Sequence, residues 1–462
     1  MQRLSDFDQA SLRTYIQIVL HFPLAKNASA QAIYQHLRSS LTRLGRDFPV
    51  LVCNLHLEKS RFGEEAFLQP SSEGIPLVAE IGGMNYATLA ARGFPARDFI
   101  HPELDLNNTL RLGDGPVPVA HVRVKFIDGG LLLMLSLHHT AADGYGLGQF
   151  AEAFADATRG EQIRGEASST VLDLPQVEEI SSATLLTLSE QCPEFEVLLN
   201  PNPSPSLPDV LPGGTPSESI PSEAKIFALR VDRIEQLRNM VRDVFGPTAR
   251  KPSVFVCLSA LTWAHVTKAR RKSEQGAPPS GDANTAKLFT PVDFRRRFHH
   301  ETEGYFGNAV ITVPTETPVE EVEAACGDQN LASLAKLVAQ VAATIADVDE
   351  ADVLRREALF RRLGDCRRLV LSQDRRLPGL LQFNSWRYFG GNFYWTIPGM
   401  EGTKKPDSVR RIQGDVSPGS ALILPLNSES EVYELLLSLP TVSMSALLQD
   451  EEWMHWVDRV ID

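Results

Sequence analysis

The sequence predicts an α/β (α+β) protein built from two domains. The chain has 462 residues, more than one domain of ordinary size holds. Residues 200–222 (NPNPSPSLPDVLPGGTPSESIPS) are rich in Pro, Ser and Gly, and proline resists both helix and strand interiors. On either side, apolar runs of strand length alternate irregularly with segments of helical spacing. We therefore expect an N-terminal domain over 1–199, a surface linker over 200–222 and a C-terminal domain over 223–462.

The composition excludes several classes of protein. Lys and Arg number 45 against 58 Asp and Glu, a net charge of −13 that repels both nucleic acid and anionic lipid. No apolar stretch approaches the roughly 20 residues needed to cross a bilayer, and the start of the chain lacks a signal-peptide pattern. The five cysteines form no C-x-x-C pair, so neither a disulfide framework nor a metal site is expected. These features predict a cytoplasmic protein.

A β-hairpin is predicted before residue 138. Apolar residues at positions 122, 124 and 126 alternate with Arg123 and Lys125, as in a half-buried strand. Asp128-Gly129-Gly130 supplies a turn, and the apolar run Leu131–Leu137 is typical of a strand buried on both faces. A helix is expected over Leu147–Thr158. The strand therefore ends in a loop that begins with two histidines, and such loops commonly carry reactive groups.

The second half predicts further helices and strands. Ser253 is a suitable N-cap for a helix that ends in basic residues, which suit the helix dipole. The expected helices are Ser253–Arg271, Leu331–Ile345, Glu350–Leu363 and Ser443–Val460, and the expected strands are Lys287–Val292 and Val432–Leu439.

The histidine pair is the main candidate for chemistry. A lone H-x-x-x-D arises by chance on the order of once in such a chain. The longer string HHxxxDG, from His138 to Gly144, is far more specific because it follows a buried strand directly. A neutral imidazole accepts a proton near its pKa of ~6.5, so His139 can act as a general base. The simpler alternative is a structural histidine, with Asp143 only capping the next helix.

HHxxxDG resembles the signature of CoA-dependent acyltransferases. Five further segments make the chain similar to the BAHD-like branch, particularly the fungal trichothecene 3-O-acetyltransferase group, in the family's own order. These are LSDFDQ and the residues after it (Leu4–Leu24), the helix Ser253–Arg270, V-D-F-R-R-R (Val292–Arg297) with Y-F-G-N (Tyr305–Asn308), and N-S-W-R (Asn384–Arg387). The resemblance implies two chloramphenicol-acetyltransferase-like lobes, each a mixed sheet with helices, and an active-site channel between them.

The resemblance also implies an activity. It implies direct acyl transfer from acyl-CoA, with acetyl as the default, to a hydroxyl of a secondary metabolite. In that mechanism His139 is the general base and no covalent enzyme intermediate forms. Acyl-CoA is then a co-substrate, no cofactor or metal is bound, the acceptor is a small molecule, and a monomer is expected.

Roles for other residues follow from the same resemblance. Asp143 pairs with an arginine, for which Arg295 is the choice, and fixes the loop that carries His139. His138 is structural. The remaining assignments are structural support from Asp293 and Asn392, and substrate or CoA contacts from Ser385, Trp395, Arg270 and Ser253.

One motif departs from the family pattern. The family's D-F-G-W-G falls on Asn392–Thr396, where only Phe393 and Trp395 remain. Asn392 cannot ionise, so the usual pair with an arginine is lost or becomes a neutral hydrogen bond. The missing glycines also remove conformational freedom from the turn.

Two alternatives remain open at this point. A condensation domain shares HHxxxDG but takes a thioester from a carrier protein, and the V-D-x-R-x-R, Y-F-G-N and S-W matches favour the CoA enzyme over it. A repurposed relative, such as a cyclase or a binding protein, is kept open by the degenerate last motif. Cys257 and the other thiols are expected in the core and not as nucleophiles.

Overall fold

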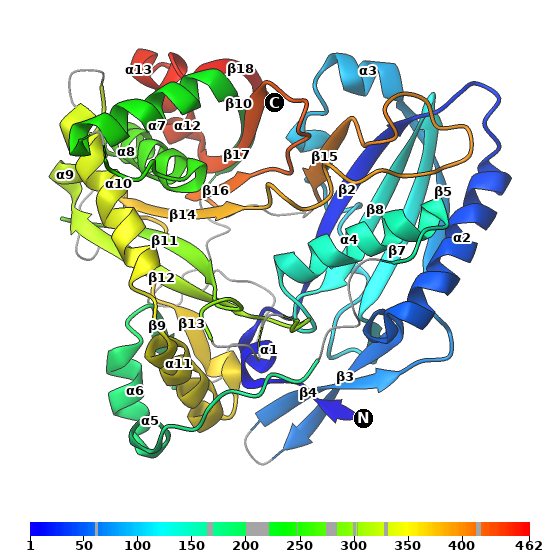
Figure 1. The fold of residues 1–462 in the computed structure, drawn as a ribbon, viewed down its shortest axis with the longest axis horizontal. Helices are drawn as coiled ribbons and strands as arrows, with labels where there is room; N and C mark the ends of the chain where they lie inside the picture. The colour runs from blue at the N-terminus through cyan, green and yellow to red at the C-terminus, as the bar shows by residue number, and fades with distance from the viewer. Residues whose placement is uncertain are drawn as a thin grey trace.

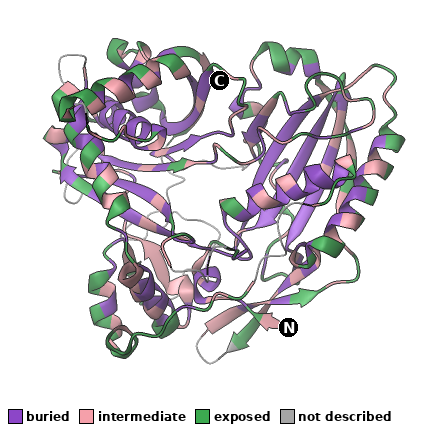
Figure 2. Cartoon of the chain, viewed as in Figure 1, coloured by how far each residue is buried: buried purple, intermediate pink, exposed green. Residues whose placement is uncertain are grey.

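The computed structural model describes residues 1–60, 63–163, 170–199, 221–246, 248–273, 284–298, 302, 304–327, 331–412 and 417–462. Two large sheets form its two lobes, as Figure 1 shows, and the mixed α/β class is confirmed. Their strands are largely buried, as the purple ribbons of Figure 2 show. Almost all of the predicted linker 200–222 lies outside the described residues, so the domain boundaries stay a prediction.

The first lobe is built on a five-stranded sheet in the order β15-β2-β8-β7-β5. The predicted hairpin is present at its centre, where Gly129 takes a φ of 74° between β7 and β8. Every residue of β8 is buried, because β2 and β7 flank it and helix α4 packs against it. The elements are β2 (Tyr15–Pro23), β5 (Leu77–Asn85), β7 (Ala120–Asp128), β8 (Gly130–His138), β15 (Ser408–Arg411), α2 (Ala30–Asp47), α3 (Tyr86–Ala91) and α4 (Gly144–Arg159).

The second lobe is built on a seven-stranded sheet in the order β12-β11-β14-β16-β17-β10-β18. Helix α8 is buried along most of its length, and the Ser253 hydroxyl caps it by accepting from the backbone N–H of Val256 at 3.2 Å. The strands are β10 (Ser222–Arg230), β11 (Thr285–Asp293), β12 (Val310–Pro318), β14 (Leu380–Ser385), β16 (Ser420–Ile423), β17 (Val432–Pro440) and β18 (Val457–Ile461). The helices are α7 (Val231–Phe245), α8 (Val254–Ser273), α9 (Val319–Glu323), α10 (Leu331–Ala346), α12 (Thr441–Leu448) and α13 (Glu451–Met454).

Two smaller units lie below the lobes in the view of Figure 1. One is a four-stranded sheet, β1-β4-β3-β6. The other joins the strand pair β13-β9 to three helices around an apolar cluster that also includes residues of β11 and β12. Their elements are α1 (Asp6–Ala10), α5 (Glu178–Ser182), α6 (Leu185–Gln191), α11 (Glu350–Leu363), β1 (Gln2–Arg3), β3 (Cys53–Ser60), β4 (Gly63–Pro70), β6 (Val117–Pro118), β9 (Phe195–Val197) and β13 (Leu369–Leu371). This second unit contains residues from both halves of the sequence.

The closing helix predicted over Ser443–Val460 is wrong. The chain instead forms α12 and α13, and then strand β18, which pairs antiparallel with β10. The first helix ends at Leu448, and Asp450 caps the second by accepting from the backbone N–H of Glu452 at 3.2 Å. The β-branched residues of Val457–Ile461 suit an edge strand better than a helix end.

No single helix in the described parts of the chain is long and apolar enough to cross a membrane. Helices α10 and α11 would be long and apolar enough only if they were counted as one segment, and they are bent by 65° where they meet.

Strand β15 links the lobes, because it comes from the second half of the sequence but pairs with β2 in the sheet of the first lobe. Arg410 on this strand donates to both carboxylate oxygens of Glu434 on β17, at 2.7 and 3.0 Å. It also donates to the backbone carbonyls of Gly93 and Phe94. Its side chain is only 2% exposed, so this bidentate pair is a buried connection between the two large sheets.

We expect Arg410→Leu to destabilise the protein by about 3–5 kcal/mol, because it leaves the half-buried Glu434 carboxylate without its cation. Denaturant unfolding followed by tryptophan fluorescence measures this change. Arg459→Leu, on an exposed arginine, is the matched control. Equal unfolding midpoints for the two variants would contradict the role given to Arg410.

Candidate active site

A cavity of about 550 Å³ lies between the lobes and is lined by residues from both halves of the sequence. His139 lies on its wall, directly after the buried strand β8. The lining also includes Asp143, Asn308, Thr312, Ser385 and Trp386. The two histidines of the motif therefore separate: His139 reaches the cavity, whereas His138 is fully buried.

The backbone and the ring of His139 are both fixed by hydrogen bonds. Its backbone N–H donates to the carbonyl of Thr14 at 2.7 Å, and its carbonyl accepts from the Ser11 hydroxyl at 3.1 Å. The ring Nδ1 lies 3.1 Å from Oδ1 of Asn308. Within the described part of the chain, Nε2 has no hydrogen-bond partner, so this nitrogen is left to meet a molecule in the cavity.

Asp143 begins helix α4 and joins it to the second lobe. Its Oδ1 accepts from the backbone N–H groups of Tyr145 and Gly146, which makes it the N-cap. Its Oδ2 accepts from the backbone N–H of Ala309 at 3.1 Å and pairs with Arg295 at 2.9 Å. The cap and the predicted ion pair are both present, and both oxygens are occupied. Asp143 is therefore not available as a base.

Arg295 uses its whole guanidinium group for structure. Besides Asp143, it contacts Asp293 Oδ1 at 3.3 Å and donates to the carbonyls of Tyr305 and Gly307 at 3.0 and 2.7 Å. Burial opposes its charge, but Asp143 and Asp293 together raise the pKa of Arg295 above its ordinary value. The side chain is 3% exposed, so a permanent cation is held inside the protein behind the His139 loop.

The environments of the two histidines favour their neutral forms. Burial lowers the pKa of His139, and this outweighs the opposing effects of its own backbone carbonyl, Asp143 and Asn308. Burial also lowers the pKa of His138 to about 3. The Nδ1 of His138 accepts from the backbone N–H of Thr140 at 3.3 Å, and its ring packs edge-on against Tyr15. This position supports a structural role for His138 and a neutral, proton-accepting His139 at pH 7.

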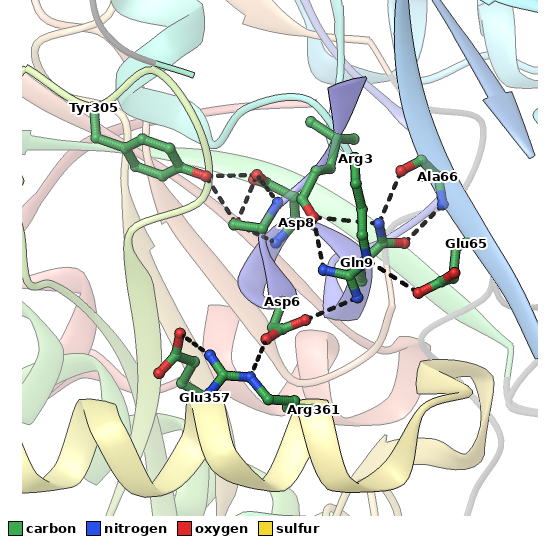
Figure 3. A network of polar contacts seen from close by, with 11 residues as sticks. Arg3, Asp6, Asp8, Gln9, Glu65, Ala66, Tyr305, Glu357 and Arg361 are labelled. Carbon is green, nitrogen blue, oxygen red and sulfur yellow. Dashed lines mark hydrogen bonds and ion pairs between the residues drawn. The ribbon is translucent and has the colours of Figure 1, made fainter. Parts of the chain in front are cut away.

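Helix α1 brings a second buried carboxylate to the site. Asp8 is 1% exposed and accepts from the backbone N–H and the side-chain Nδ2 of Asn308, at 2.7 and 2.9 Å. Its other oxygen accepts from Ser5 and from the Tyr305 hydroxyl, which points at it in Figure 3. Burial raises the pKa of the Asp8 carboxyl, whereas these hydrogen bonds favour its ionised form.

The same helix is tied to α11. Figure 3 shows Asp6 turned toward Arg361, which also contacts Glu357. The N–O distance from Arg361 to Asp6 is 3.0 Å. Helix α1 is thus held from two sides, and the position of Asp8 is fixed by elements of the second half of the chain.

The glycine of HHxxxDG serves close packing. A Cβ on Gly144 would lie 2.8 Å from the ring of Phe389, and Gly148 is equally close to the same ring. Side chains at these two positions would push the ring, which lines the cavity, away from α4. Ser385 and Trp386 also line the cavity, and the substrate contact predicted for Ser385 stays a prediction.

Three of the predicted contact residues lie elsewhere. Arg270 is fully buried, and its guanidinium donates to the carbonyls of Leu380 and Arg375, so it does not present its charge to a phosphate. Ser253 caps α8. Trp395 is fully buried and packs edge-on against Phe22 and Phe154. None of the three is among the described residues that line the cavity. The neighbouring Lys268 and Arg271 pair with carboxylates.

Asn392 makes neutral hydrogen bonds, which is one of the two outcomes expected from the sequence. Its Nδ2 donates to the carbonyl of Leu426 at 3.0 Å, and its Oδ1 accepts from the backbone N–H of Ser428 at 2.7 Å. The motif at Asn392–Thr396 therefore holds the loop of Leu426 and Ser428 in place. Neither Asn392 nor Trp395 is among the described residues that line the cavity at His139.

Asn308 and Asp8 are site residues that were not predicted from the sequence. Both lie inside the matched segments, Asp8 in LSDFDQ and Asn308 in Y-F-G-N. A polar residue within two positions of Phe7 or Phe306 was the available signal, because a buried polar side chain needs a partner. The cysteines are buried or partly buried, and burial raises the pKa of Cys257 to about 12, as expected for a core thiol. The described residues contain no cluster of three or more His, Cys, Asp or Glu suited to a metal ion.

We expect Arg295→Lys to lower the stability by about 3 kcal/mol, because an ammonium cannot reproduce the planar set of donors to Asp143, Tyr305 and Gly307. Thermal unfolding of the variant measures the loss. The same change at its exposed neighbour, Arg296→Lys, is the control. If Arg295→Lys were as stable as this control, the hydrogen bonds of the buried Arg295 guanidinium would not be needed for stability.

Comparisons with known proteins agree with this architecture. The model of the Transferase family matches residues 2–454. O-acetyltransferase SAT5 of Stachybotrys chartarum is 26% identical over 391 residues, which cover 82% of this chain and 73% of that protein. Acyltransferase easC of Emericella nidulans is 25% identical over 359 residues, which cover 73% and 71%.

Solved structures share the fold at low sequence identity. The structure of F. sporotrichioides TRI101 complexed with coenzyme A and T-2 has a TM-score of 0.74 and 18% identity, and the match covers 100% of both chains. Vinorine synthase has a TM-score of 0.63 and 18% identity, with 99% of this chain and 94% of that chain covered. The two-lobed fold and the family match confirm the resemblance seen in the motifs: the chain belongs to the Transferase family.

Proposed function

We propose that the protein is an acyl-CoA-dependent acyltransferase that O-acylates a small secondary metabolite, with His139 as the general base. The chain is similar along most of its length to proteins named as an O-acetyltransferase and an acyltransferase. It shares its fold with TRI101, whose structure contains coenzyme A and T-2. The observation that carries the assignment of the base is the neutral imidazole of His139 on the wall of the interlobe cavity, with its Nε2 unused by the described residues.

The proposed reaction is a direct transfer. Nε2 of His139 removes the proton of the acceptor hydroxyl as its oxygen forms a bond to the thioester carbonyl carbon. The resulting tetrahedral intermediate collapses by breaking its C–S bond. The thiolate takes the proton back from Nε2, which leaves the ester, free CoA and a neutral imidazole. Asp143 and Arg295 hold the loop in place throughout.

Finer parts of the proposal concern the substrates and the setting. Acetyl-CoA is the proposed acyl donor, with Ser385 and Trp386 on the cavity wall as contacts for the substrates. The enzyme is proposed to act as a monomer in the cytoplasm, without nucleic acid or membrane partners, which the net charge of −13 supports. Because Asn392 and Trp395 lie away from the described cavity wall, the degenerate motif does not favour a repurposed, non-catalytic protein over an enzyme.

We expect His139→Ala to lower the rate of acyl transfer by about 10²–10⁴-fold, because the acceptor hydroxyl loses its base. Release of free thiol from acetyl-CoA, with a panel of apolar alcohols as acceptors, measures the rate. His101→Ala, on an exposed histidine, is the control for handling and folding. An unchanged rate in the His139 variant would remove the general-base assignment. The absence of transfer from every acyl-CoA by the unmodified protein would instead favour the repurposed alternative.

The pH dependence gives a second test. His139 accepts a proton only when its ring is neutral, and burial holds its pKa below the ordinary value despite the nearby Asp143 carboxylate. We therefore expect kcat/KM to rise with pH below neutrality and to be level at pH ~7, with an acid-limb midpoint below ~6.5. A profile that still rises steeply above pH ~7.5 would contradict a base in this environment.

A further inference from the structure

Helix α11 contributes an arginine with unused hydrogen-bond donors to the cavity wall. Arg356 lines the cavity and is only 5% exposed. Its Nε donates to Oε1 of Glu194 at 2.6 Å, and its Nη1 donates to the backbone carbonyl of Asp352 at 2.8 Å. Among the described residues, Nη2 has no hydrogen-bond partner. A guanidinium group has five N–H donors, so the two on Nη2 are left for a molecule in the cavity.

The partner of Arg356 is also incompletely hydrogen bonded. Glu194 is 1% exposed, and its Oε2 is buried without a hydrogen-bond partner in the described part of the chain. Burial raises the pKa of the Glu194 carboxyl, and the Arg356 cation opposes this shift. A buried ion pair contributes little to stability, because desolvation of the two charges offsets their attraction. The pair and its unused polar atoms therefore need an explanation other than stability, and a ligand supplies one.

The surroundings of Arg356 on the cavity wall are aromatic and apolar. Phe7, Phe195 and Phe360 line the same cavity, and their rings pack edge-on, with Phe360 between the other two at 5.3 and 5.6 Å. Phe360 lies one turn after Arg356 on α11, so the two side chains share a face of the helix. All three apolar residues of β13 are also on the lining. These elements form the small unit at the lower left of Figure 1.

The charges on this part of the wall are already compensated. Arg356 pairs with Glu194, and two further arginines of the lining, Arg13 and Arg367, both pair with the carboxylate of Glu64. A carboxylate or a phosphate that entered would lose its hydration without gaining an uncompensated cation. A neutral oxygen acceptor loses much less on leaving water, and a charged N–H donor binds it strongly. The wall therefore suits a neutral oxygen better than an anion.

We propose that Arg356 is a specificity-determining residue that binds a neutral carbonyl oxygen of the acceptor through Nη2. The substrate class is an apolar alcohol that also carries a ketone, ester or lactone oxygen away from the reacting hydroxyl. This inference rests on the proposed function for its place in the reaction. The binding of such a molecule by Arg356 is nevertheless independent of acyl transfer, so the two are tested separately.

The test uses flexible probes that scan the distance between hydroxyl and carbonyl. Methyl ω-hydroxyalkanoates of increasing chain length are compared with primary alkanols and with ω-hydroxyalkanoic acids of the same length. Isothermal titration calorimetry of the full chain without acyl-CoA, at pH ~7 where the acids are ionised, measures the affinities. We expect the ester of the fitting length to bind about 10–100-fold more tightly than the matching alkanol, because it gains a hydrogen bond from a charged donor. The acid should bind less tightly than the ester.

Two variants remove the donor in different ways. Arg356→Lys keeps a cation beside Glu194 but lacks the second terminal nitrogen. The double variant Arg356→Met, Glu194→Gln removes both charges and leaves no unpaired buried carboxylate. Each should lose the 10–100-fold preference for the ester and keep the affinity for the alkanol. The matched control is Arg355→Lys, on the neighbouring arginine of α11, which pairs with Asp352 and is not among the described residues on the cavity lining. Thermal unfolding shows which variants are folded.

Glu194→Gln alone tests the argument from charge. This change leaves the Arg356 cation uncompensated, so the ω-hydroxyalkanoic acid should now bind more tightly than the ester, the reverse of the order in the unmodified protein. If the unmodified protein already prefers the acid, the neutral class of substrate is wrong.

The remaining outcomes separate this inference from the proposed function. Equal affinity for ester and alkanol at every length overturns the inference, as does an ester preference that persists in either folded variant. A raised KM for acetyl-CoA in the variants, with unchanged affinity for the esters, would place Arg356 at the acyl donor and also overturn it. If the esters bind as expected but no acyl-CoA supports transfer, the proposed function fails and the binding role of Arg356 stands.

Discussion

Two buried carboxylates constrain this molecule more than any other feature. A carboxylate inside a protein must have each oxygen hydrogen bonded, since an unpaired buried charge costs several kcal/mol. Asp8 and Asp143 both belong to the first half of the chain, but most of their donors lie between Arg295 and Ala309 in the second half. Satisfying the two charges therefore joins the lobes at the loop that carries His139. The stability of the interface and the geometry of the candidate base have one physical origin.

The parts of the fold that the sequence predicted are those set by local patterns. The alternation before Gly129 and the apolar run after it gave the hairpin, and α11 begins and ends where its helical spacing does. The strand at Val457–Ile461 was missed because its reason is a pairing with β10, more than 200 residues away. Similarly, nothing in the order of residues shows that the charge of Arg270 meets two backbone carbonyls inside the lobe.

For the site too, the residues within local motifs were predicted and the contacts between distant segments were not. HHxxxDG and V-D-F-R-R-R placed His139, Asp143 and Arg295, and the ion pair is where the motifs indicated. The contact of Asn308 with the ring of His139 could not be seen, because the two residues lie 169 positions apart in the chain and meet only when the two halves pack together. The degenerate final motif raised a doubt that only the structure could address. Asn392 donates to the backbone carbonyl of Leu426, and Trp395 packs in the hydrophobic core against Phe154. The substitutions in this motif therefore affect packing away from His139.

The position of β15 has a consequence for biogenesis. The strands β2 and β8 leave the ribosome well before β15 at Ser408–Arg411, which begins 270 residues after the end of β8 (408 − 138). During that interval, roughly 14–54 seconds at about 5–20 residues per second, the edge of β2 in the nascent first lobe has unpaired backbone N–H and C=O groups. The sheet of the first lobe is completed only once β15 has been synthesised, and until then the exposed edge of β2 is open to pairing with other chains.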